Sequence, residues 1–191
     1  MAELKIVVTG GFGVGKTTMV ATLSEIPPLT TEALLTDAGR DIDDVTGVEG
    51  KTHTTVAMDF GRITLPHPQQ PMILFLFGTP GQDRFWFAWE DISYGAVGAV
   101  VLADTRRLAD SFAAVSYFED LKMPFVVAVN KFDTAAHHYL PQEVAQALEL
   151  GPDVPVLTCD VRQRASAKAV LIRLVKHSLN HRQHLISGAP A

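Results

Sequence analysis

The fold of this chain is decided by one stretch near its N-terminus, Gly10-Gly11-Phe12-Gly13-Val14-Gly15-Lys16-Thr17-Thr18. The apolar residues 4–8 just before it predict a buried strand, and residues 16–25 after it predict a helix. That helix ends before Pro27 and Pro28, because proline cannot continue a helix. A glycine-rich turn between a strand and a helix is the layout of a phosphate-binding loop.

The loop matches the pattern G-x-x-x-x-G-K-T at residues 10–17. Its glycines let the backbone turn tightly and point N–H groups at a phosphate, and the helix that follows adds the positive end of its dipole. Lys16 supplies a cation for the β- and γ-phosphates, and the Thr17 hydroxyl is placed to ligate Mg²⁺. The alternative is a glycine-rich turn that happens to contain a lysine, but the flanking strand and helix favour the phosphate loop. The predicted nucleotide-binding residues here are Gly10, Gly13, Val14, Gly15, Lys16, Thr17 and Thr18.

Outside the loop, short β-branched runs alternate with helical patterns, which is typical of an α/β layered domain. The predicted strands are residues 4–8, 55–60, 72–77, 97–103, 125–129 and 154–157, and the predicted helices are residues 16–25, 108–121, 141–150 and 164–185. Residues 61–71 are too few for a helical crossover, so the strands on either side form an antiparallel hairpin. The sequence therefore predicts a six-stranded, mostly parallel sheet with one antiparallel hairpin and helices on both faces, the α/β fold class of a P-loop NTPase.

The composition excludes several classes of protein. The 191 residues carry 16 Lys and Arg against 21 Asp and Glu, a net charge of −5 that argues against a nucleic-acid binder. The longest apolar runs, residues 72–77, 96–103 and 124–129, are far shorter than the roughly 18 residues of a membrane-spanning helix. The N-terminus lacks a signal peptide, Ala2 stands where myristoylation needs glycine, and the C-terminus has no cysteine for prenylation. With Cys159 as its single cysteine, the chain is predicted to be cytoplasmic, without disulfides and without a direct membrane anchor.

A second motif, Asn130-Lys131-Phe132-Asp133, follows the predicted strand at residues 125–129. The Asp133 carboxylate can accept hydrogen bonds from guanine N1–H and N2–H₂ together, whereas adenine lacks this pair of donors. Lys131 is expected to lie along the base or the phosphate loop, and Asn130 to brace the neighbouring loops. The alternative is a solvated loop in which Asp133 caps a helix.

Residues 158–161 reach the same edge of the sheet, one strand further along. Their backbone N–H groups are placed to donate to the guanine carbonyl. The predicted base-binding residues are therefore Asn130, Lys131, Asp133, Cys159 and Asp160.

The phosphate loop and the N-K-x-D motif, in this order and spacing, resemble those of the Ras-like small GTPases across nearly the whole chain. The resemblance implies a single G domain over residues 1–185, with switch I at about residues 30–55 and switch II at about residues 78–94, and a short flexible tail at residues 186–191. It also implies that Mg²⁺ is the cofactor and that GTP and GDP are the ligands.

The same resemblance assigns further site residues. Thr55 is expected to ligate Mg²⁺ together with Thr17, and the Gly81 N–H to follow the γ-phosphate. Gln82 is expected to orient the attacking water, which makes Gln82 and Lys16 the predicted catalytic residues.

One position departs from the Ras-like pattern. The D-x-x-G-Q signature appears here as Gly78-Thr79-Pro80-Gly81-Gln82, with glycine in place of the aspartate that organises the metal. Water or a neighbouring carboxylate, Asp59 or Asp104, could compensate, and a looser magnesium site with slower turnover is expected. Gly78 could equally be a backbone hinge for switch II.

The stretches LFLFGTPGQDRFWF and AVGAVVLAD resemble a bacterial branch of that family, the actinobacterial conservon GTPases of the CvnD and MfpB-like type, and more distantly the polarity GTPase MglA. This resemblance implies a switch that acts on a regulatory protein partner, either of the roadblock type or a pentapeptide-repeat protein.

Two features of the presumed switch segments stay open. Arg84 and Arg40 could act on the γ-phosphate in cis, but each is also read as a solvated loop arginine, and a partner could supply an activating group. The aromatic residues Phe85, Trp86, Phe87 and Trp89 form either a partner-docking surface or a wedge that packs switch II onto the sheet.

These observations lead to one expected function and two alternatives. The expected function is a small GTPase that binds GTP with Mg²⁺, hydrolyses it slowly and acts as a molecular switch. The alternatives are a GTP/GDP-binding regulatory scaffold with negligible hydrolysis, and a P-loop kinase or ATPase, which would have no use for N-K-x-D.

Overall fold

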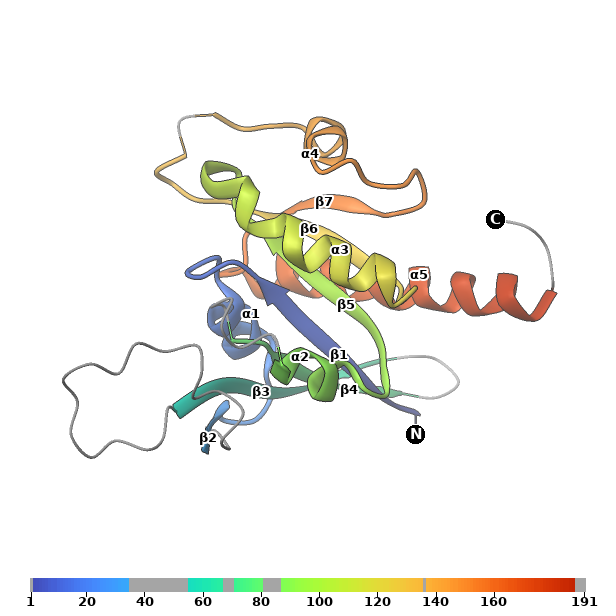
Figure 1. Cartoon of the computed structure of the whole chain (residues 1–191). Helices are drawn as coiled ribbons and strands as arrows, with labels where there is room; N and C mark the ends of the chain where they lie inside the picture. The colour runs from blue at the N-terminus through green and yellow to red at the C-terminus, as the bar shows by residue number, and fades with distance from the viewer. Residues whose placement is uncertain (1, 35–54, 67–70, 81–86, 136, 188–191) are drawn as a thin grey trace.

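The computed structural model describes residues 2–34, 55–66, 71–80, 87–135 and 137–187, and the strands in these ranges form one sheet (Figure 1). The strands are β1 (Ala2–Gly10), β2 (Leu29–Leu34), β3 (Thr55–Leu65), β4 (Met72–Gly78), β5 (Ala96–Ala103), β6 (Phe125–Asn130) and β7 (Val156–Cys159). Their order across the sheet is β2-β3-β4-β1-β5-β6-β7. From β4 to β7 each neighbouring pair is parallel, whereas β3 is antiparallel to both β2 and β4. The predicted α/β fold class, with its mostly parallel sheet, is confirmed.

The β3–β4 hairpin is present as predicted, and the described sheet has one strand more than the six expected. The added strand is β2, which runs antiparallel along β3 from the pair Leu29–Phe60 to the pair Leu34–Thr55. Residues 29–34 read LTTEAL, which contains no continuous apolar run. An edge strand buries less of its surface than a central one, so the hydrophobicity of this segment carried little signal.

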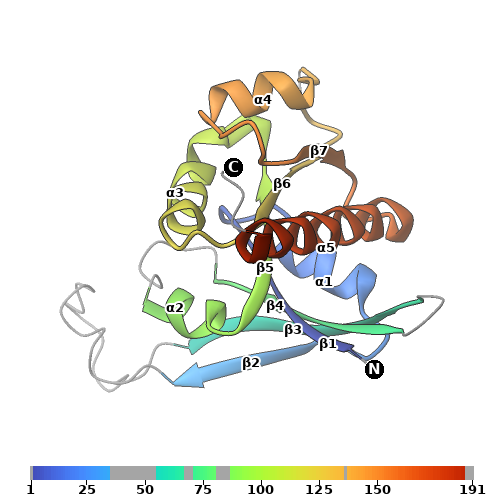
Figure 2. The ribbon, with the colours of Figure 1, turned by 90° about the vertical axis from the view of Figure 1, so that its right-hand side faces the viewer.

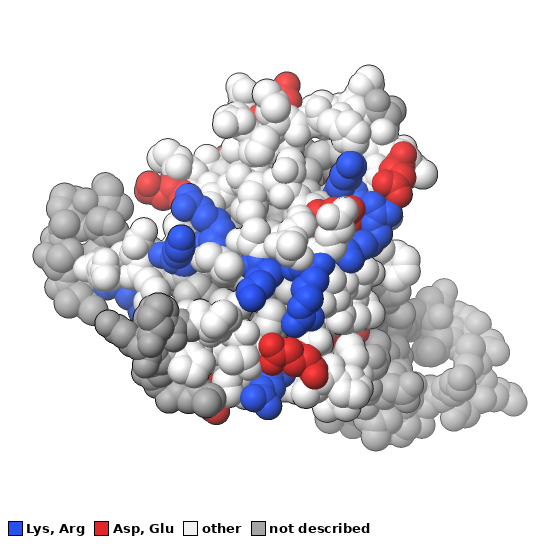
Figure 3. All heavy atoms as spheres, turned by 180° about the vertical axis from the view of Figure 1, so that it is seen from behind, with Lys and Arg blue, Asp and Glu red and all other residues white. Residues whose placement is uncertain are grey.

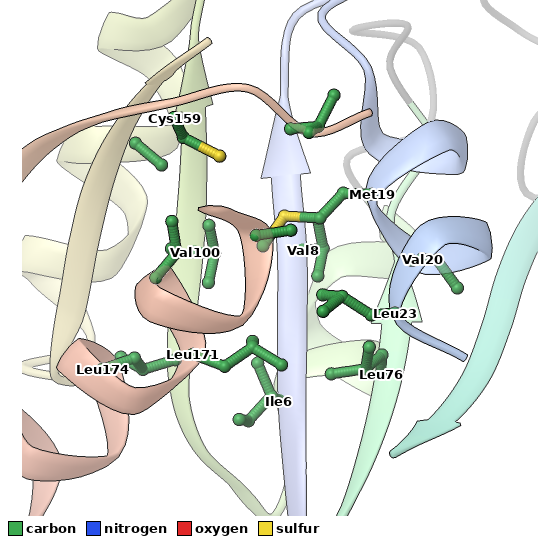
Figure 4. Packing of buried hydrophobic residues seen from close by; sticks show 14 of the residues in the cluster. Ile6, Val8, Met19, Val20, Leu23, Leu76, Val100, Cys159, Leu171 and Leu174 are labelled. Carbon is green, nitrogen blue, oxygen red and sulfur yellow. The ribbon is translucent and has the colours of Figure 1, made fainter. Parts of the chain in front are cut away.

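Helices cover both faces of the sheet (Figure 2). They are α1 (Lys16–Leu23), α2 (Phe87–Ser93), the 3₁₀ helix η3 (Thr105–Ser111), α3 (Phe112–Asp120), α4 (Pro141–Ala147) and α5 (Arg164–Ser187). On one face, Met19 and Leu23 of α1 and Leu171 and Leu174 of α5 pack against Val8 and other residues of the central strands (Figure 4). On the other face a second cluster joins α2, α3 and α4 to β5 and β6.

The helix predicted over residues 108–121 consists of two elements, η3 and α3. The Asp104 carboxylate accepts a hydrogen bond from the backbone N–H of Arg106 and so starts a turn earlier than the apolar pattern indicates. Arg107, with φ −143° and ψ 48°, then interrupts the helical geometry. The last helix reaches Ser187, two residues beyond the predicted end at residue 185. In contrast, β7 begins at Val156, because the N–H of Val154 donates to the Gly151 carbonyl in a turn.

Sequence analysis did not predict α2, which lies at the end of the segment assigned to switch II. Its Trp89 is 6% exposed and packs against α3, with its ring stacked 6.2 Å from Phe118 and edge-on to Tyr117 at 5.3 Å. The packing interpretation of the aromatic run therefore holds for Trp89. Phe85, Trp86 and the side chain of Phe87 lie outside the described residues.

Basic side chains gather on the face of the molecule that α1 and α5 cover (Figure 3). The basic residues of α5 are Arg164, Lys168, Arg173, Lys176 and Arg182, and the helix contains no aspartate or glutamate. The net negative charge of the chain is therefore carried elsewhere. No helix in the described ranges combines the length and the apolar character needed to cross a membrane.

Candidate functional site

The phosphate-loop motif forms the turn between β1 and α1, and its backbone requires glycine at several positions. Gly10, Gly13 and Gly15 have φ values of 134°, 74° and 107°, a region that residues with a side chain rarely adopt. A Cβ atom at Gly10 would collide with the carbonyl oxygen of Leu102, and one at Gly15 would lie 2.9 Å from Asn130 Nδ2. The loop is therefore pressed against the ends of β5 and β6, where the second motif begins.

Lys16 is buried in the first turn of α1, and its ammonium group points back into the loop. Its Nζ atom donates to the carbonyl oxygens of Gly10 at 2.8 Å and Gly11 at 2.9 Å. Burial lowers the pKa of Lys16 to about 8, although the nearby Asp59 carboxylate opposes the shift. The two carbonyl oxygens thus hold the Lys16 ammonium group in the loop, where phosphate oxygens could replace them as its hydrogen-bond partners.

The hydroxyl of Thr17, the predicted magnesium ligand, donates to Asp59 Oδ2 at 2.6 Å. Asp59 lies on β3 and was considered only as one of two possible replacements for the missing aspartate. A hydroxyl and a carboxylate beside a phosphate loop fit Mg²⁺, which prefers oxygen ligands and is held by few protein groups together with substrate phosphates. Thr17 is the described residue that would ligate the ion, with Asp59 orienting its hydroxyl, and Mg²⁺ when bound would neutralise charge on the phosphates.

The remaining predicted phosphate-side residues are only partly described. Val14 is buried and Thr18 is exposed. Thr55 is the first residue of β3, opposite Leu34 of β2. Gly81, Gln82, Arg40 and Arg84 lie outside the described residues, as does the side chain of Thr55.

Asn130 connects three loops at the carboxyl edge of the sheet. Its Nδ2 donates to the Val14 carbonyl of the phosphate loop at 2.9 Å, and its Oδ1 accepts from the N–H of Val161 at 3.2 Å. The neighbouring Lys131 has an exposed side chain, and its backbone N–H donates to the Cys159 carbonyl at 2.7 Å. These contacts bring the N-K-x-D segment, the phosphate loop and the β7–α5 loop together.

Asp133 forms an ion pair with Arg162, a residue that sequence analysis did not single out. Arg162 Nη1 and Nη2 donate to the two carboxylate oxygens of Asp133 at 2.6 and 3.1 Å. The same guanidinium contacts Asp160 at 2.9 and 3.0 Å, so it lies between two carboxylates. These bonds lower the pKa of Asp133 and lower that of Asp160 to about 2. The signal available in the sequence was an arginine two residues after Asp160, a predicted base-side carboxylate.

The β7–α5 loop differs from the prediction that its N–H groups face a guanine carbonyl. The N–H of Asp160 donates to Ser166 Oγ at 3.0 Å, and that of Val161 is taken by Asn130. Both groups would have to exchange partners to reach a base. Cys159 is buried at the end of β7, and burial raises the pKa of its thiol.

Arg106 is a second arginine that sequence analysis missed. It donates through Nε and Nη2 to Asp104 and through Nη1 to the Thr134 hydroxyl at 2.5 Å. Its guanidinium also lies 3.8 Å from the centre of the Phe132 ring. Arg106 thus ties the loop that carries Asp133 to the end of β5.

Comparison with known proteins identifies the family. A model of the family described as conserved hypothetical ATP binding protein matches residues 8–181. The chain belongs to this family. An uncharacterized protein of Methanocaldococcus jannaschii is 32% identical to it over 133 residues, which cover 69% of this chain and 71% of the archaeal protein. The family match supports nucleotide binding.

The expected membership in the Ras-like small GTPases, with its conservon and MglA-like branch, was wrong, because the family that matches is a different one. The residues behind that expectation were a phosphate loop, which many nucleotide-binding proteins contain, the short motifs N-K-x-D and G-T-P-G-Q, and the likeness of residues 74–87 and 96–104 to one bacterial branch. Short motifs show which chemistry a site can support, but proteins that bind similar ligands share them. The partner classes implied by the resemblance, roadblock-type and pentapeptide-repeat proteins, no longer have support.

Proposed function

We propose that this chain binds GTP with Mg²⁺, hydrolyses it slowly and acts as a GTP/GDP-dependent switch for a regulatory protein partner. The observation that carries the proposal is a pair of hydrogen bonds at Asn130: its amide donates to the phosphate loop and accepts from a backbone N–H of the β7–α5 loop. Through them the loop with Asp133 is attached to the loop that would hold the phosphates. A nucleotide with its phosphates on the glycine-rich turn would then extend its base toward Asp133.

Asp133 supports guanine rather than adenine recognition. Its side chain is 70% exposed, and both carboxylate oxygens already accept hydrogen bonds from one fork of N–H donors, that of Arg162. Guanine presents a comparable fork through N1–H and N2–H₂, so it can replace the guanidinium at the same two oxygens. Adenine cannot, so with ATP the Asp133 carboxylate would stay paired with Arg162 and contribute nothing to base binding.

The family description favours a second candidate, the binding of ATP. Lys16 and Thr17 would serve ATP equally well, because both nucleotides carry the same triphosphate. The two candidates differ only at the base, and the base therefore decides the test.

The test is the affinity for GTP, ATP and xanthosine triphosphate, measured by calorimetry with wild type and Asp133→Asn. Wild type is expected to bind GTP more tightly than ATP, because only guanine can donate to both Asp133 oxygens. Asp133→Asn is expected to lose GTP affinity and gain affinity for xanthosine triphosphate, whose 2-keto group accepts from the new amide. Asp120→Asn, which alters an exposed carboxylate at the end of α3, is the matched control and should change nothing. Equal wild-type affinities for GTP and ATP would favour the second candidate.

Arg162→Ala adds an independent arm to this titration. Without the guanidinium, GTP no longer has to displace a charged partner from Asp133, so GTP affinity should rise while ATP affinity stays unchanged. A loss of GTP affinity would instead mean that Arg162 holds Asp133 in its binding position.

Hydrolysis is tested separately, by single-turnover measurements with wild type and Gln82→Ala. We expect the substitution to slow hydrolysis by about 10²-fold, because a misplaced water loses its alignment with the phosphate. Equal, near-zero hydrolysis rates for both proteins would favour a GTP-binding scaffold with negligible hydrolysis over an enzyme.

A further inference from the structure

The last residue of β4 is Gly78, and the register of the β3–β4 hairpin places Asp59 directly opposite it. P-loop NTPases hold Mg²⁺ with the Ser or Thr of the phosphate loop and with an aspartate that ends a strand of the sheet. In this chain β4 lies beside β1, the strand that leads into the phosphate loop, but it ends without a carboxylate.

The space next to Gly78 is filled by Asp59. A Cβ atom added at Gly78 would lie 3.0 Å from Asp59 Cβ and 3.1 Å from Asp59 Oδ2. A side chain at residue 78 would therefore crowd Asp59, which would have to shift by a few tenths of an ångström. The backbone of Gly78 has no left-handed φ, so its conformation does not itself require glycine. Glycine at this position leaves the most room for the neighbouring carboxylate.

The carboxylate also has the correct partner. Asp59 Oδ2 accepts a hydrogen bond from the Thr17 hydroxyl at 2.6 Å. A hydroxyl that donates a hydrogen bond to a carboxylate turns its lone pairs outward and becomes a better metal ligand. Asp104, the other carboxylate that sequence analysis considered, is instead held by Arg106 through its backbone N–H and its guanidinium.

We infer that Asp59 supplies, from β3, the carboxylate that orients Thr17 and the bound Mg²⁺. In this exchange between neighbouring strands, the carboxylate lies on β3 instead of β4, and Gly78 at the end of β4 leaves room for it. Asp59 is a positioning residue, because it acts on the metal through Thr17. The inference rests on the proposed nucleotide function for its ligand but is independent of whether the base is guanine or adenine.

The exchange can be reversed by mutation, which provides the test. The variants are Asp59→Ala, Gly78→Asp and the double variant Asp59→Ala/Gly78→Asp, with Asp59→Asn as a version that preserves shape. The readout is the release rate of a fluorescent GDP analogue, or of the ADP analogue if the protein prefers ATP, as Mg²⁺ is titrated from an EDTA baseline. This measures metal dependence of binding and needs no hydrolysis.

In wild type, Mg²⁺ is expected to slow release with a defined half-saturating concentration. Asp59→Ala and Asp59→Asn should each raise that concentration about 10- to 100-fold, the usual loss when a group that orients a metal ligand is removed. Gly78→Asp alone should also be impaired, because it forces two carboxylates together. The double variant should recover to within a few-fold of wild type, since the carboxylate introduced on β4 then has the room that Asp59 left.

Asp120→Ala is the control for a lost exposed carboxylate, and thermal unfolding of each variant checks its fold. Unchanged Mg²⁺ half-saturation in folded Asp59→Ala, or in Asp59→Asn if the alanine variant does not fold, overturns the inference. So does a double variant that is no better than Asp59→Ala while remaining folded. Affinity in EDTA reports on the proposed function separately, because a chain that binds no nucleotide fails there before Mg²⁺ is added.

Discussion

Lys16 combines burial with a positive charge, and this combination has a measurable pH dependence. Its side chain is buried, and the pKa falls from the ordinary 10.5 to about 8. In the free protein, raising the pH through 8 deprotonates the Lys16 ammonium group and so removes the positive charge that attracts phosphate oxygens. Bound phosphate favours the charged form, so nucleotide binding takes up a proton in this range.

We therefore expect the association constant for nucleotide to fall above pH 8, approaching about tenfold per pH unit. The measurement is a series of binding titrations between pH 7 and 9, with Lys16→Arg as the control because arginine stays charged throughout. A profile that falls equally in both proteins would assign the effect to another group. Stability has the opposite sign: the unfolded chain holds this proton more tightly, so this group makes unfolding less favourable as the pH rises from 8 to 10.5.

Among the elements, α2 shows how a short helix is held at the edge of a site. It has seven residues, too few for stable helix formation on its own, so its position depends on packing. Trp89 supplies that packing through its stacked contact with Phe118 and its edge contact with Tyr117. The end of the segment assigned to switch II is thus anchored to α3.

Trp89→Ala should lower the free energy of unfolding by about 3–5 kcal/mol, the usual loss for a large aromatic side chain in a core. The control is Tyr94→Ala, directly after the same helix, because Tyr94 is 86% exposed. Its effect should stay within about 0.5 kcal/mol. Urea unfolding of both variants makes the comparison, and similar losses would show that α2 is not held through Trp89.

At the scale of the whole molecule, a nucleotide bound at the proposed site would link the two halves of the sheet. The phosphate loop follows β1, the Asp133 loop follows β6, and Asp59 lies on β3, so one ligand would contact strands from both sides of β1. A ligand that binds only the folded chain stabilises it by mass action.

At 100 times its dissociation constant, GTP with Mg²⁺ should stabilise the fold by about 2.7 kcal/mol. For a chain of this size that corresponds to a rise in Tm of roughly 5–10 °C. Thermal unfolding followed by tryptophan fluorescence measures it, with ATP at the same concentration as the comparison. An equal rise with ATP would contradict the assigned role of Asp133 at the level of the whole fold.

Local patterns were sufficient for most of the fold. Continuous apolar runs located the central strands, because strands covered on both faces carry a strong hydrophobic signal. The edge strand β2 and the short helix α2 were missed, since each owes its structure to a neighbour: β2 to its pairing with β3, and α2 to the packing of Trp89 on α3. The family could not be read from motifs that unrelated nucleotide-binding proteins share.

The sequence by itself determined the phosphate loop, the two residues that begin α1 and the order of strands and helices around them, because these depend on neighbours within a few positions. The tertiary structure alone decided which side chains meet there. Asp59 reaches Thr17 across 42 residues through the register of β3 with β4, and Arg162 reaches Asp133 across 29 residues because parallel strands end at one edge. Pairing between distant segments sets such contacts, and no local pattern encodes the register that produces them.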